Sequence, residues 1–370
     1  MRTVTCAAPV NIAVIKYCKE KSTAFTWGSR NGAPDPGIWQ SDGELLAVRR
    51  RASKRKLEGS DEDVLNWHVH ICSTNNFPTA AGLASSAAGY ACLVYALGQV
   101  YGVEGDLSSI ARQGSGSACR SVHGGLVRWY KGEMKDGTDS FARPIAPANH
   151  FPNLHVIICV ANDGRKKTGS TEGMRRTVQT SRLMQYRIRE SVGLRIDSMM
   201  QAIEEKNWST FCDLTIADSN EMHAVCQDSF PPCIYMSDTS HAVVELIHRY
   251  NELQISKGNL KYKVCYTFDA GPNACLFVPG AVANEMLSLL KHTFPPSSPQ
   301  NADSFIRGMK SQTLTLSKEL ESIADENAQS GRLKYLIHTK VGEGPRVLTE
   351  DGAHLLDPVS GLPTESGGMA

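Results

Sequence analysis

Hydrophobic and polar positions predict a mixture of strands and helices in the first part of the chain. Val4–Val14 is apolar and partly β-branched, which favours a strand. In Val64–Ser73 apolar and polar side chains alternate, as in a half-buried strand. A turn at residues 75–78 follows, and small residues then lead into a helix that we expect to end near Tyr101. Leu154–Val160 is a continuous apolar run, which is typical of a strand buried on both faces.

After residue 160 the apolar positions follow helical spacing. Two strands, Lys261–Phe268 and Ala274–Val278, flank the turn Asp269–Asn273, and a last strand is expected at Leu333–Val341. The expected helices are residues 171–186, 191–206, 208–226, 241–253 and 281–291.

This order predicts an α+β protein with two domains. The predicted domains are residues 1–150 and 151–341, followed by a loose tail at residues 342–370. The segment Cys18–Glu44 is atypical, because it shows neither a period of two nor one of 3.6 and is rich in turn formers.

Composition and charge narrow the possible partners. The chain has 370 residues and a net charge of +1, with 41% hydrophobic and 21% charged residues, as in ordinary soluble globular proteins. There is therefore no general electrostatic reason to expect nucleic acid or an anionic membrane surface as a partner. The basic run Arg49–Lys56 is interpreted as a solvated helix face or loop, with a localisation signal or nucleic-acid patch as the alternative.

Two further features bear on the compartment. Ile71–Val103 has no charged side chain and is long enough to span a bilayer, but its Ser, Thr, Asn and Gln residues favour a buried central helix. Eleven scattered cysteines, with no Cys-x-x-Cys pair, argue against disulfides or zinc and favour a reducing compartment.

Three Gly/Ser-rich segments are candidates for binding an anionic substrate. They are Pro78–Gly89, Gly114–Gly125 and Thr168–Met174, and each precedes or opens an expected helix or strand. A helix start offers unpaired N–H groups and the positive end of the dipole, which suits phosphate. Arg120 in the second segment adds a planar fork for phosphate or carboxylate. The alternative is that small residues only allow tight helix packing. None of the segments has the Gly-x-x-x-x-Gly-Lys-Ser/Thr pattern of a standard P-loop.

Asp269, at the end of an expected strand, is a candidate base. The alternative is that it only shapes the Asp-x-Gly-Pro turn. In the same way Ser115 and Ser117 could be turn residues, Arg120 a member of a surface ion pair, and Lys16 a solvated side chain.

Several longer motifs together resemble one known family. Pro-Thr-Ala-Ala-Gly-Leu-Ala-Ser-Ser-Ala-Ala-Gly at Pro78–Gly89 resembles the phosphate loop of the GHMP kinase superfamily. The wider match is to its mevalonate diphosphate decarboxylase (diphosphomevalonate decarboxylase) family. The matching segments are residues 8–17, 75–89, 114–121, 169–174, 218–220, 230–232 and 266–273.

The resemblance implies a fold and an activity. The expected fold is the two-domain GHMP kinase fold, with a ribosomal-S5-like N-terminal domain, a ferredoxin-like C-terminal domain and the site between them. The expected enzyme converts ATP and mevalonate 5-diphosphate to isopentenyl diphosphate, CO2, ADP and phosphate in isoprenoid and sterol biosynthesis. It uses Mg²⁺ and is expected to be a cytosolic homodimer, with neither nucleic acid nor a membrane as a partner.

The resemblance also implies residue roles. Asp269 takes or orients the proton of the substrate hydroxyl, Arg120 holds the carboxylate or diphosphate, and Lys16 neutralises charge between the ligands. Polar groups of the substrate are assigned to Ser115 and Ser117, and its diphosphate to Ser170 and Tyr17. The residues assigned to ATP are Pro78, Ala81, Gly82, Leu83, Ala84, Ser85 and Ser86.

The chain departs from the family after Tyr17. Family members continue with Trp-Gly-Lys-Arg and soon a Pro-x-Asn-Ser-Ser-Leu-Ser stretch on a strand. Here Cys18–Glu44 has neither motif, and the segment before Arg49 is shorter than usual. Loss of strands would expose a sheet edge and part of the core. One hypothesis is therefore that this chain is a poorly active or unstable form of the enzyme. A second hypothesis is a GHMP small-molecule kinase that stops at the phosphorylated product, and a third is a non-catalytic protein that keeps the fold.

Overall fold

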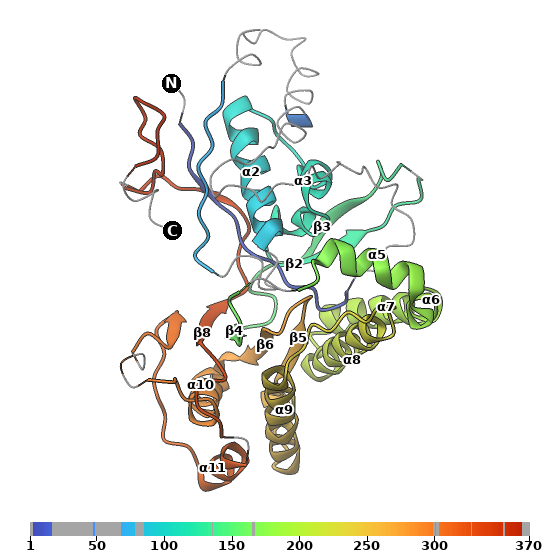
Figure 1. The fold of residues 1–370 in the computed structure, drawn as a ribbon, viewed down its shortest axis with the longest axis vertical. Helices are drawn as coiled ribbons and strands as arrows, with labels where there is room; N and C mark the ends of the chain where they lie inside the picture. Colours follow the sequence, from blue (N-terminus) through green and yellow to red (C-terminus); the bar gives the residue numbers. More distant parts are fainter. Residues whose placement is uncertain are drawn as a thin grey trace.

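The computed structural model describes residues 3–16, 47–48, 68–77, 85–134, 136–164, 167–298, 300, 303–326, 328–350 and 352–364. Figure 1 shows two groups of elements, one above the other. The N-terminal group contains β1, α2, α3, α4, β2, β3 and β9, and the C-terminal group contains the remaining elements.

A five-stranded sheet organises the C-terminal group. Its strands lie in the order β5-β6-β4-β8-β7, antiparallel except for the parallel pair β7–β8. Their bounds are β4 Leu154–Val160, β5 Cys265–Phe268, β6 Ala274–Pro279, β7 Ile306–Gly308 and β8 Tyr335–Lys340. The apolar run of Leu154–Val160 predicted β4 correctly, because this central strand has neighbours on both sides and few exposed positions.

Helices of the C-terminal group pack against this sheet or against one another and bury aromatic side chains. They are α5 Ser170–Thr180, α6 Arg182–Tyr186, α7 Val192–Glu204, α8 Trp208–Gln227, α9 Asp238–Ser256, α10 Ala283–Thr293 and α11 Lys318–Asp325. Phe211, Tyr250 and Phe268 are fully buried in the core. The single helix expected at residues 171–186 is divided at Ser181, whose side chain accepts a hydrogen bond from the Met184 N–H and so caps α6.

The N-terminal group is built around α2, Ser85–Tyr101, as the small-residue segment predicted. Its other elements are β1 Cys6–Ala7, α3 Ser108–Gly114, α4 Ala118–Ser121, and the antiparallel pair β2 Leu126–Tyr130 and β3 Phe141–Ala146. Ala87 and Ala91 are fully buried on α2, where their small side chains let neighbouring segments come close. Within the described ranges, no helix is sufficiently long and apolar to cross a membrane.

Some strand predictions are wrong for the described residues. Residues 68–73 form no strand, and only Cys6–Ala7 of Val4–Val14 is a strand. Alternation reports burial of alternate side chains, whereas a strand also needs a hydrogen-bonded neighbour. Conversely β3, β7 and α11 were not predicted from the sequence.

The segment after Gly342, expected to be loose, is paired with the N-terminal group. Strand β9, Arg346–Val347, is antiparallel to β1. The Gly125 N–H donates to the Gly342 carbonyl at 2.9 Å. Gly124 packs so closely that an added Cβ would lie 2.2 Å from the Glu343 backbone. This partner lies far away along the chain, so no local pattern could have indicated it.

Candidate active site

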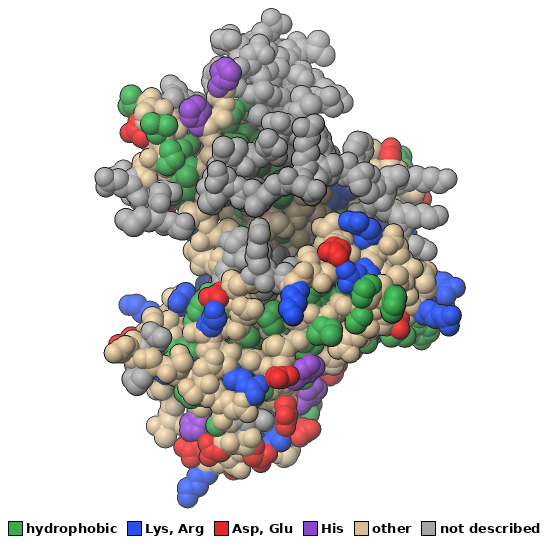
Figure 2. All heavy atoms as spheres, viewed as in Figure 1, with side chains coloured by type: hydrophobic (Ala, Val, Ile, Leu, Met, Phe, Trp, Pro, Cys, Tyr) green, Lys and Arg blue, Asp and Glu red, His purple; other side chains and the backbone are tan. Residues whose placement is uncertain are grey.

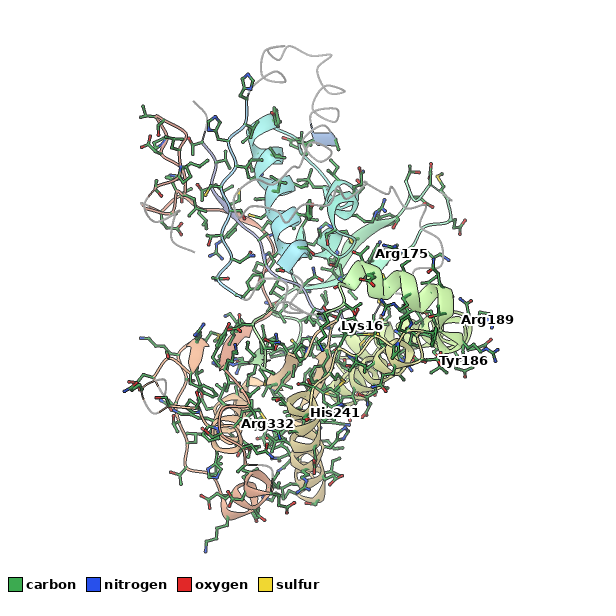
Figure 3. All side chains as sticks on the ribbon, viewed as in Figure 1. Lys16, Arg175, Tyr186, Arg189, His241 and Arg332 are labelled. Carbon is green, nitrogen blue, oxygen red and sulfur yellow. The ribbon has the colours of Figure 1, made fainter. Side chains whose placement is uncertain are left out.

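The centre of the candidate site is an ion pair between Lys16 and Asp269. Lys16 Nζ donates to Asp269 Oδ1 at 2.6 Å. Lys16 is buried, while 24% of the Asp269 side chain is exposed, so the carboxylate remains accessible from solvent. In Figure 3 Lys16 lies where the two groups of elements meet.

A buried ionic cluster fixes the backbone of Lys16. Its N–H donates to Asp218 Oδ2 at 2.6 Å, and its carbonyl accepts from an Arg187 guanidinium N–H at 2.9 Å. Asp218 and Arg187 are both fully buried, and Asp218 Oδ1 lies 2.8 Å from each of the Arg187 and Arg195 guanidinium groups. Glu221 pairs with the same two arginines. Two arginines and two carboxylates thus compensate one another in a site where Arg187 and Asp218 are fully buried and Arg195 and Glu221 are partly exposed.

Asp218 lies on α8, and the two residues that follow it on this helix hold β5, the strand that ends just before Asp269. Ser219 Oγ accepts from the Phe268 N–H at 3.1 Å, and Asn220 Oδ1 accepts from the Tyr266 hydroxyl at 3.1 Å. Three consecutive residues, Asp218–Asn220, therefore hold Lys16 and the end of β5. Sequence reasoning assigned them no role, although they formed one of the segments matched to the family.

The turn after Asp269 is tied to the end of β4. Asn273 Oδ1 accepts from the N–H groups of Ala161 and Asn162 at 2.8 and 3.0 Å, and its Nδ2 donates to the Asn162 carbonyl at 2.8 Å. The Gly271 N–H donates to the Asp269 carbonyl at 2.7 Å. Asp269 thus shapes a turn and also presents its carboxylate, so the two interpretations of this residue are compatible.

Arg120, on α4, is held by Asn11. Arg120 Nε donates to Asn11 Oδ1 at 3.0 Å. Asn11 Nδ2 donates to the Ser117 carbonyl at 2.9 Å and to Ser121 Oγ at 2.7 Å. Asn11 was missed as a site residue, and its only signal was its place in the matched segment 8–17.

The structure also brings together two of the Gly/Ser-rich segments. Ser86 Oγ, in the first turn of α2, lies 3.3 Å from Ser115 Oγ. Ser85 begins α2 and Ser117 immediately precedes α4. The other residues assigned to ATP lie outside the described residues; they are Pro78, Ala81, Gly82, Leu83 and Ala84. Tyr17 and the run Arg49–Lys56 also lie outside them.

Ser170 opens α5, which contributes cationic side chains near the junction. Arg175 and Arg176 follow on the same helix, and Figure 2 shows Lys and Arg side chains over α5. Gly173 packs so closely against the buried Tyr235 that an added Cβ would lie 2.0 Å from its hydroxyl oxygen. The position of α5, and with it Ser170, therefore depends on a glycine at residue 173.

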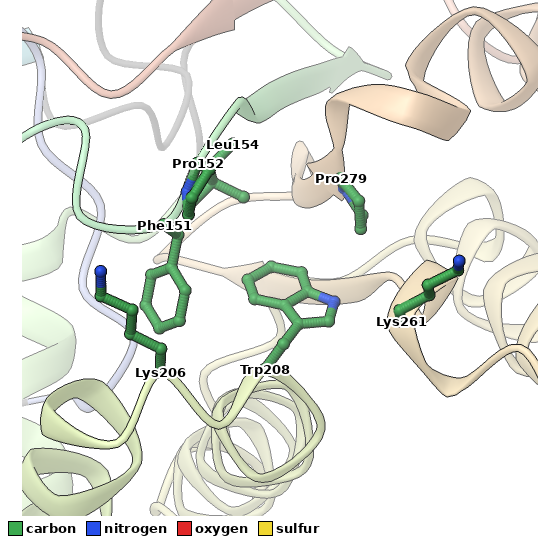
Figure 4. Close-up of a pocket in the computed structure, with 7 residues that line it drawn as sticks. All are labelled: Phe151, Pro152, Leu154, Lys206, Trp208, Lys261 and Pro279. Carbon is green, nitrogen blue, oxygen red and sulfur yellow. The ribbon is translucent and has the colours of Figure 1, made fainter.

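A pocket of about 210 Å³ lies elsewhere (Figure 4). It is lined by Phe151, Leu154, Trp208 and Pro279, among others. Leu154 begins β4 and Pro279 ends β6, whereas Asp269 follows the opposite end of the sheet. This pocket is therefore separate from the candidate site.

The described residues fit a magnesium ion that arrives with a nucleotide. Where the chain is described, no group of three or more His, Cys, Asp or Glu side chains could hold a metal ion. Mg²⁺ is usually bound by one or two carboxylates together with substrate phosphates and water, and needs no cage made only of protein. Asp269 is the accessible carboxylate at this site.

Comparisons with known proteins identify the family. Residues 42–142 match the model of the diphosphomevalonate decarboxylase-like N-terminal domain, and residues 156–348 match that of the mevalonate 5-diphosphate decarboxylase C-terminal domain. Diphosphomevalonate decarboxylase of Bos taurus is 44% identical over 396 residues, covering 97% of both proteins.

Solved structures agree with the sequence comparisons. A crystal structure of mevalonate 5-diphosphate decarboxylase has a TM-score of 0.75 and 34% identity, and the match covers 97% of this chain and 100% of that one. The structure of MDDEF in complex with MVAPP, AMPPCP and magnesium has a TM-score of 0.59 and 28% identity, covering 84% of this chain and 78% of that one. The fold is therefore the GHMP-kinase fold of these enzymes, as the resemblance implied. With relatives matched along almost its whole length and both domain models present, the chain belongs to the diphosphomevalonate decarboxylase family.

Proposed function

We propose that the chain catalyses the ATP-dependent decarboxylation of mevalonate 5-diphosphate to isopentenyl diphosphate, with release of ADP, phosphate and CO2, in isoprenoid and sterol biosynthesis. The observation that supports this best is the Lys16–Asp269 pair, held by consecutive residues of α8 at the junction of the two groups. It places an accessible carboxylate next to a fixed ammonium, which suits proton removal beside phosphate groups.

In the first step Asp269 accepts the proton of the tertiary 3-hydroxyl as the γ-phosphoryl group of ATP arrives. An O–P bond to the substrate forms while the bond between the γ-phosphorus and the leaving ADP oxygen breaks. The Lys16 ammonium offsets the negative charge that gathers between Asp269 and the phosphates.

In the second step the C3–O bond breaks and phosphate leaves with its electron pair. The electrons of the C1–C2 bond then form the C2=C3 double bond as CO2 departs. Positive charge develops at C3, and the negative charge of the departing phosphate stabilises this state. Arg120, held through Nε by Asn11, binds the carboxylate or diphosphate and aligns the two leaving groups.

The remaining assignments concern binding. Ser115 and Ser117 bind polar groups of the substrate, and Ser170 with Tyr17 binds its diphosphate. ATP phosphates lie at the start of α2, where Ser85 and Ser86 and the positive end of the helix dipole meet them. Magnesium, when bound, neutralises the phosphate charge that opposes phosphoryl transfer.

The test is to incubate the purified chain with ATP, Mg²⁺ and mevalonate 5-diphosphate labelled at C1, and to measure labelled CO2 and ADP. Equal amounts of the two products are expected. ADP with a stable phosphate ester, but without CO2, would favour a small-molecule kinase. No ADP, and no calorimetric signal with ADP or substrate, would favour a non-catalytic protein.

A second candidate is an impaired form of the same enzyme. The alignment with the Bos taurus relative spans 396 positions although the chain has only 370 residues, so the chain lacks residues that the relative has. The N-terminal domain model matches only from residue 42. A chimera that carries the relative's segment in place of Cys18–Glu44 is expected to release CO2 faster than the native chain, and equal rates would contradict impairment.

We also propose two domains, residues 1–150 and 151–341, and a homodimer in the cytosol. A hydrophobic cluster formed only by residues between 8 and 122 supports the domain division, while the larger cluster around the C-terminal sheet also contacts Ile12 and Leu126. Tyr186 and Leu194, on α6 and α7, are 58% and 72% exposed and could pack against a second copy. Sedimentation of the native chain as a dimer and of Leu194→Glu as a monomer would support this face. If both the native chain and Leu194→Glu sediment as dimers, this face is excluded as the dimer interface. Fluorescence microscopy of the tagged chain tests the cytosolic location.

A further inference from the structure

The segment that follows β8 crosses from the C-terminal group to the N-terminal group (Figure 1). Strand β8 ends at Lys340, and two residues later the Gly342 carbonyl accepts from the Gly125 N–H at 2.9 Å. Strand β9 then pairs with β1. Residues 342–348, here called the brace, therefore connect the C-terminal sheet to two separate segments of the N-terminal group.

The first of these segments is the loop after α4, the helix that carries Arg120. Gly124, in this loop, approaches the brace so closely that an added Cβ would lie 2.2 Å from the carbonyl carbon and oxygen of Glu343. A Cβ on Gly344 would likewise lie 2.8 Å from the Gly124 nitrogen, and the φ of Gly344 is +98°, which favours glycine. The His123 N–H donates to the Arg120 carbonyl at 3.2 Å. The backbones of the brace and the loop are thus in direct contact, and the loop is bonded to Arg120.

The second segment leads from β1 to Asn11, the residue whose side chain holds Arg120. Strands β1 and β9 are antiparallel, and Asn11 follows the end of β1 by four residues. Between them, a Cβ on Gly342 would lie 3.9 Å from Pro9 Cβ, so the brace also borders this part of the chain. The brace therefore contacts both segments that meet in the hydrogen bond between Arg120 and Asn11.

The Arg120–Asn11 contact depends on the relative position of these two segments. The two residues are 109 positions apart in the chain, and Arg120 Nε donates to Asn11 Oδ1 at 3.0 Å. A displacement of about 1 Å between the segments would lengthen this bond beyond hydrogen-bonding range. Contacts of one brace with both segments restrict such a displacement.

We propose that the brace is a positioning element for substrate binding. It holds the loop after α4 and the segment before Asn11 in register, and so keeps the Arg120 guanidinium oriented for the anionic group of mevalonate 5-diphosphate. This rests on the proposed function, in which Arg120 binds the carboxylate or diphosphate of the substrate. The brace acts through Arg120 and Asn11 and takes no part in making or breaking bonds. Because it continues from β8, it also sets these two residues relative to the C-terminal sheet.

Two glycine substitutions place a methyl group on either side of the same contact. Gly124→Ala directs it against the Glu343 backbone, and Gly344→Ala directs it against the Gly124 nitrogen. Each should raise KM for mevalonate 5-diphosphate by about tenfold, the effect expected when one hydrogen bond to a charged group is weakened. KM for ATP should be nearly unchanged. Because both substitutions act on one contact, the double variant should raise KM by much less than the product of the two single effects.

The split between KM and kcat separates positioning from simple loss of folded protein. Partial unfolding reduces the amount of active enzyme, which lowers the apparent kcat but leaves KM the same. Gly193→Ala, whose methyl group meets no atom within 4 Å, is the control and should retain the native KM and kcat. If one single variant does not fold, the other decides. A native KM for the substrate, or single effects that multiply in the double variant, would overturn the proposal.

Hydrogen exchange followed by mass spectrometry tests the brace without any activity. In the full-length Gly124→Ala variant, the amides of residues 117–125 and 342–348 should lose protection together, while those of α8 should exchange as in the native chain. Unchanged protection of residues 117–125, or an equal loss along the whole chain, would overturn the inference. If protection falls as expected but the native chain releases no CO2, the proposed function fails while the brace stands.

Discussion

Lys16 Nζ and Asp269 Oδ1 lie 2.6 Å apart although 253 residues separate them in the chain. Residues 218–220 of α8 bring the two side chains together, because Asp218 binds the backbone N–H of Lys16 while Ser219 and Asn220 bind β5. Helix α8 thus fixes the backbone around the pair, and the Asp269 carboxylate is accessible to solvent. Such an arrangement restricts the geometry of both groups before any substrate binds.

Replacing Asp269 by Asn should nearly abolish CO2 release. The amide has almost the same shape, but it cannot accept the hydroxyl proton. General-base catalysis typically contributes about 10²–10⁴-fold, so we expect kcat to fall by about 10³, with KM for ATP little changed. Initial rates of labelled CO2 release measure this. Asp303→Asn, at an exposed turn, is the control. An Asp269→Asn variant with more than a tenth of native kcat would exclude Asp269 as the base.

Replacing Asn11 by Ala should weaken substrate binding through Arg120. Arg120 Nε then loses its acceptor at 3.0 Å, which is one of the contacts that orient its guanidinium. A hydrogen bond to a charged group contributes about 1.5–3 kcal/mol, so KM for mevalonate 5-diphosphate should rise by roughly tenfold or more. Asn11→Asp retains an acceptor for Arg120 and should recover part of this loss. Equal KM values for the two variants would show that the Arg120 contact is unimportant.

Replacing Asp218 by Asn should destabilise the protein. Arg187 and Arg195 would keep their positive charges but lose the buried carboxylate that pairs with both of them, while Glu221 remains. Breaking a buried ion pair costs about 3–5 kcal/mol, so the urea midpoint of the C-terminal group should fall clearly. Asp197→Asn, exposed on the neighbouring helix α7, should change stability by less than about 0.5 kcal/mol. Similar midpoints for both variants would contradict the role of the cluster.

Two glycine substitutions test the packing of α5. In Gly173→Ala the new methyl group would lie 2.0 Å from the Tyr235 hydroxyl, which belongs to a rigid and buried side chain. Overpacking of this kind costs about 1–3 kcal/mol, and the shift of Ser170 should raise KM for the substrate. Gly193→Ala on α7 meets no atom within 4 Å and should be neutral or slightly stabilising. Thermal unfolding and steady-state kinetics together check both outcomes.

Stability should depend on pH through His223. The pKa of this residue falls from 6.5 to about 4 on folding, mainly through burial. Between these values the unfolded chain binds a proton that the folded chain does not, so the free energy of unfolding decreases as pH falls from 6.5 to 4. The shift corresponds to about 3 kcal/mol. His223→Gln cannot titrate and should lack this part of the dependence, as urea unfolding at several pH values would reveal. Parallel pH curves for the two proteins would contradict it.

Local patterns predicted much of the C-terminal group. The continuous apolar run of Leu154–Val160 indicated β4, and the Gly-Pro turn after Phe268 placed Asp269 at the end of a strand. Such patterns succeed where a segment is buried throughout or where a turn needs particular residues. They failed for residues 68–73, because alternation does not supply a hydrogen-bonded neighbour. The expectations for residues 78–84 and Cys18–Glu44 lie outside the described residues.

The sequence by itself determined the family and the identity of the candidate groups: Asp269, Arg120, Lys16 and the serines of the Gly/Ser-rich segments. It did not determine how these groups are held. The contacts of Asp218 with Lys16, and of Asn11 with Arg120, were decided by the tertiary structure. The physical reason is that a periodic pattern records whether a side chain is buried and which local hydrogen bonds it can form. Its distant partner depends on how helices and strands pack, and only packing placed α8 behind both Lys16 and Asp269.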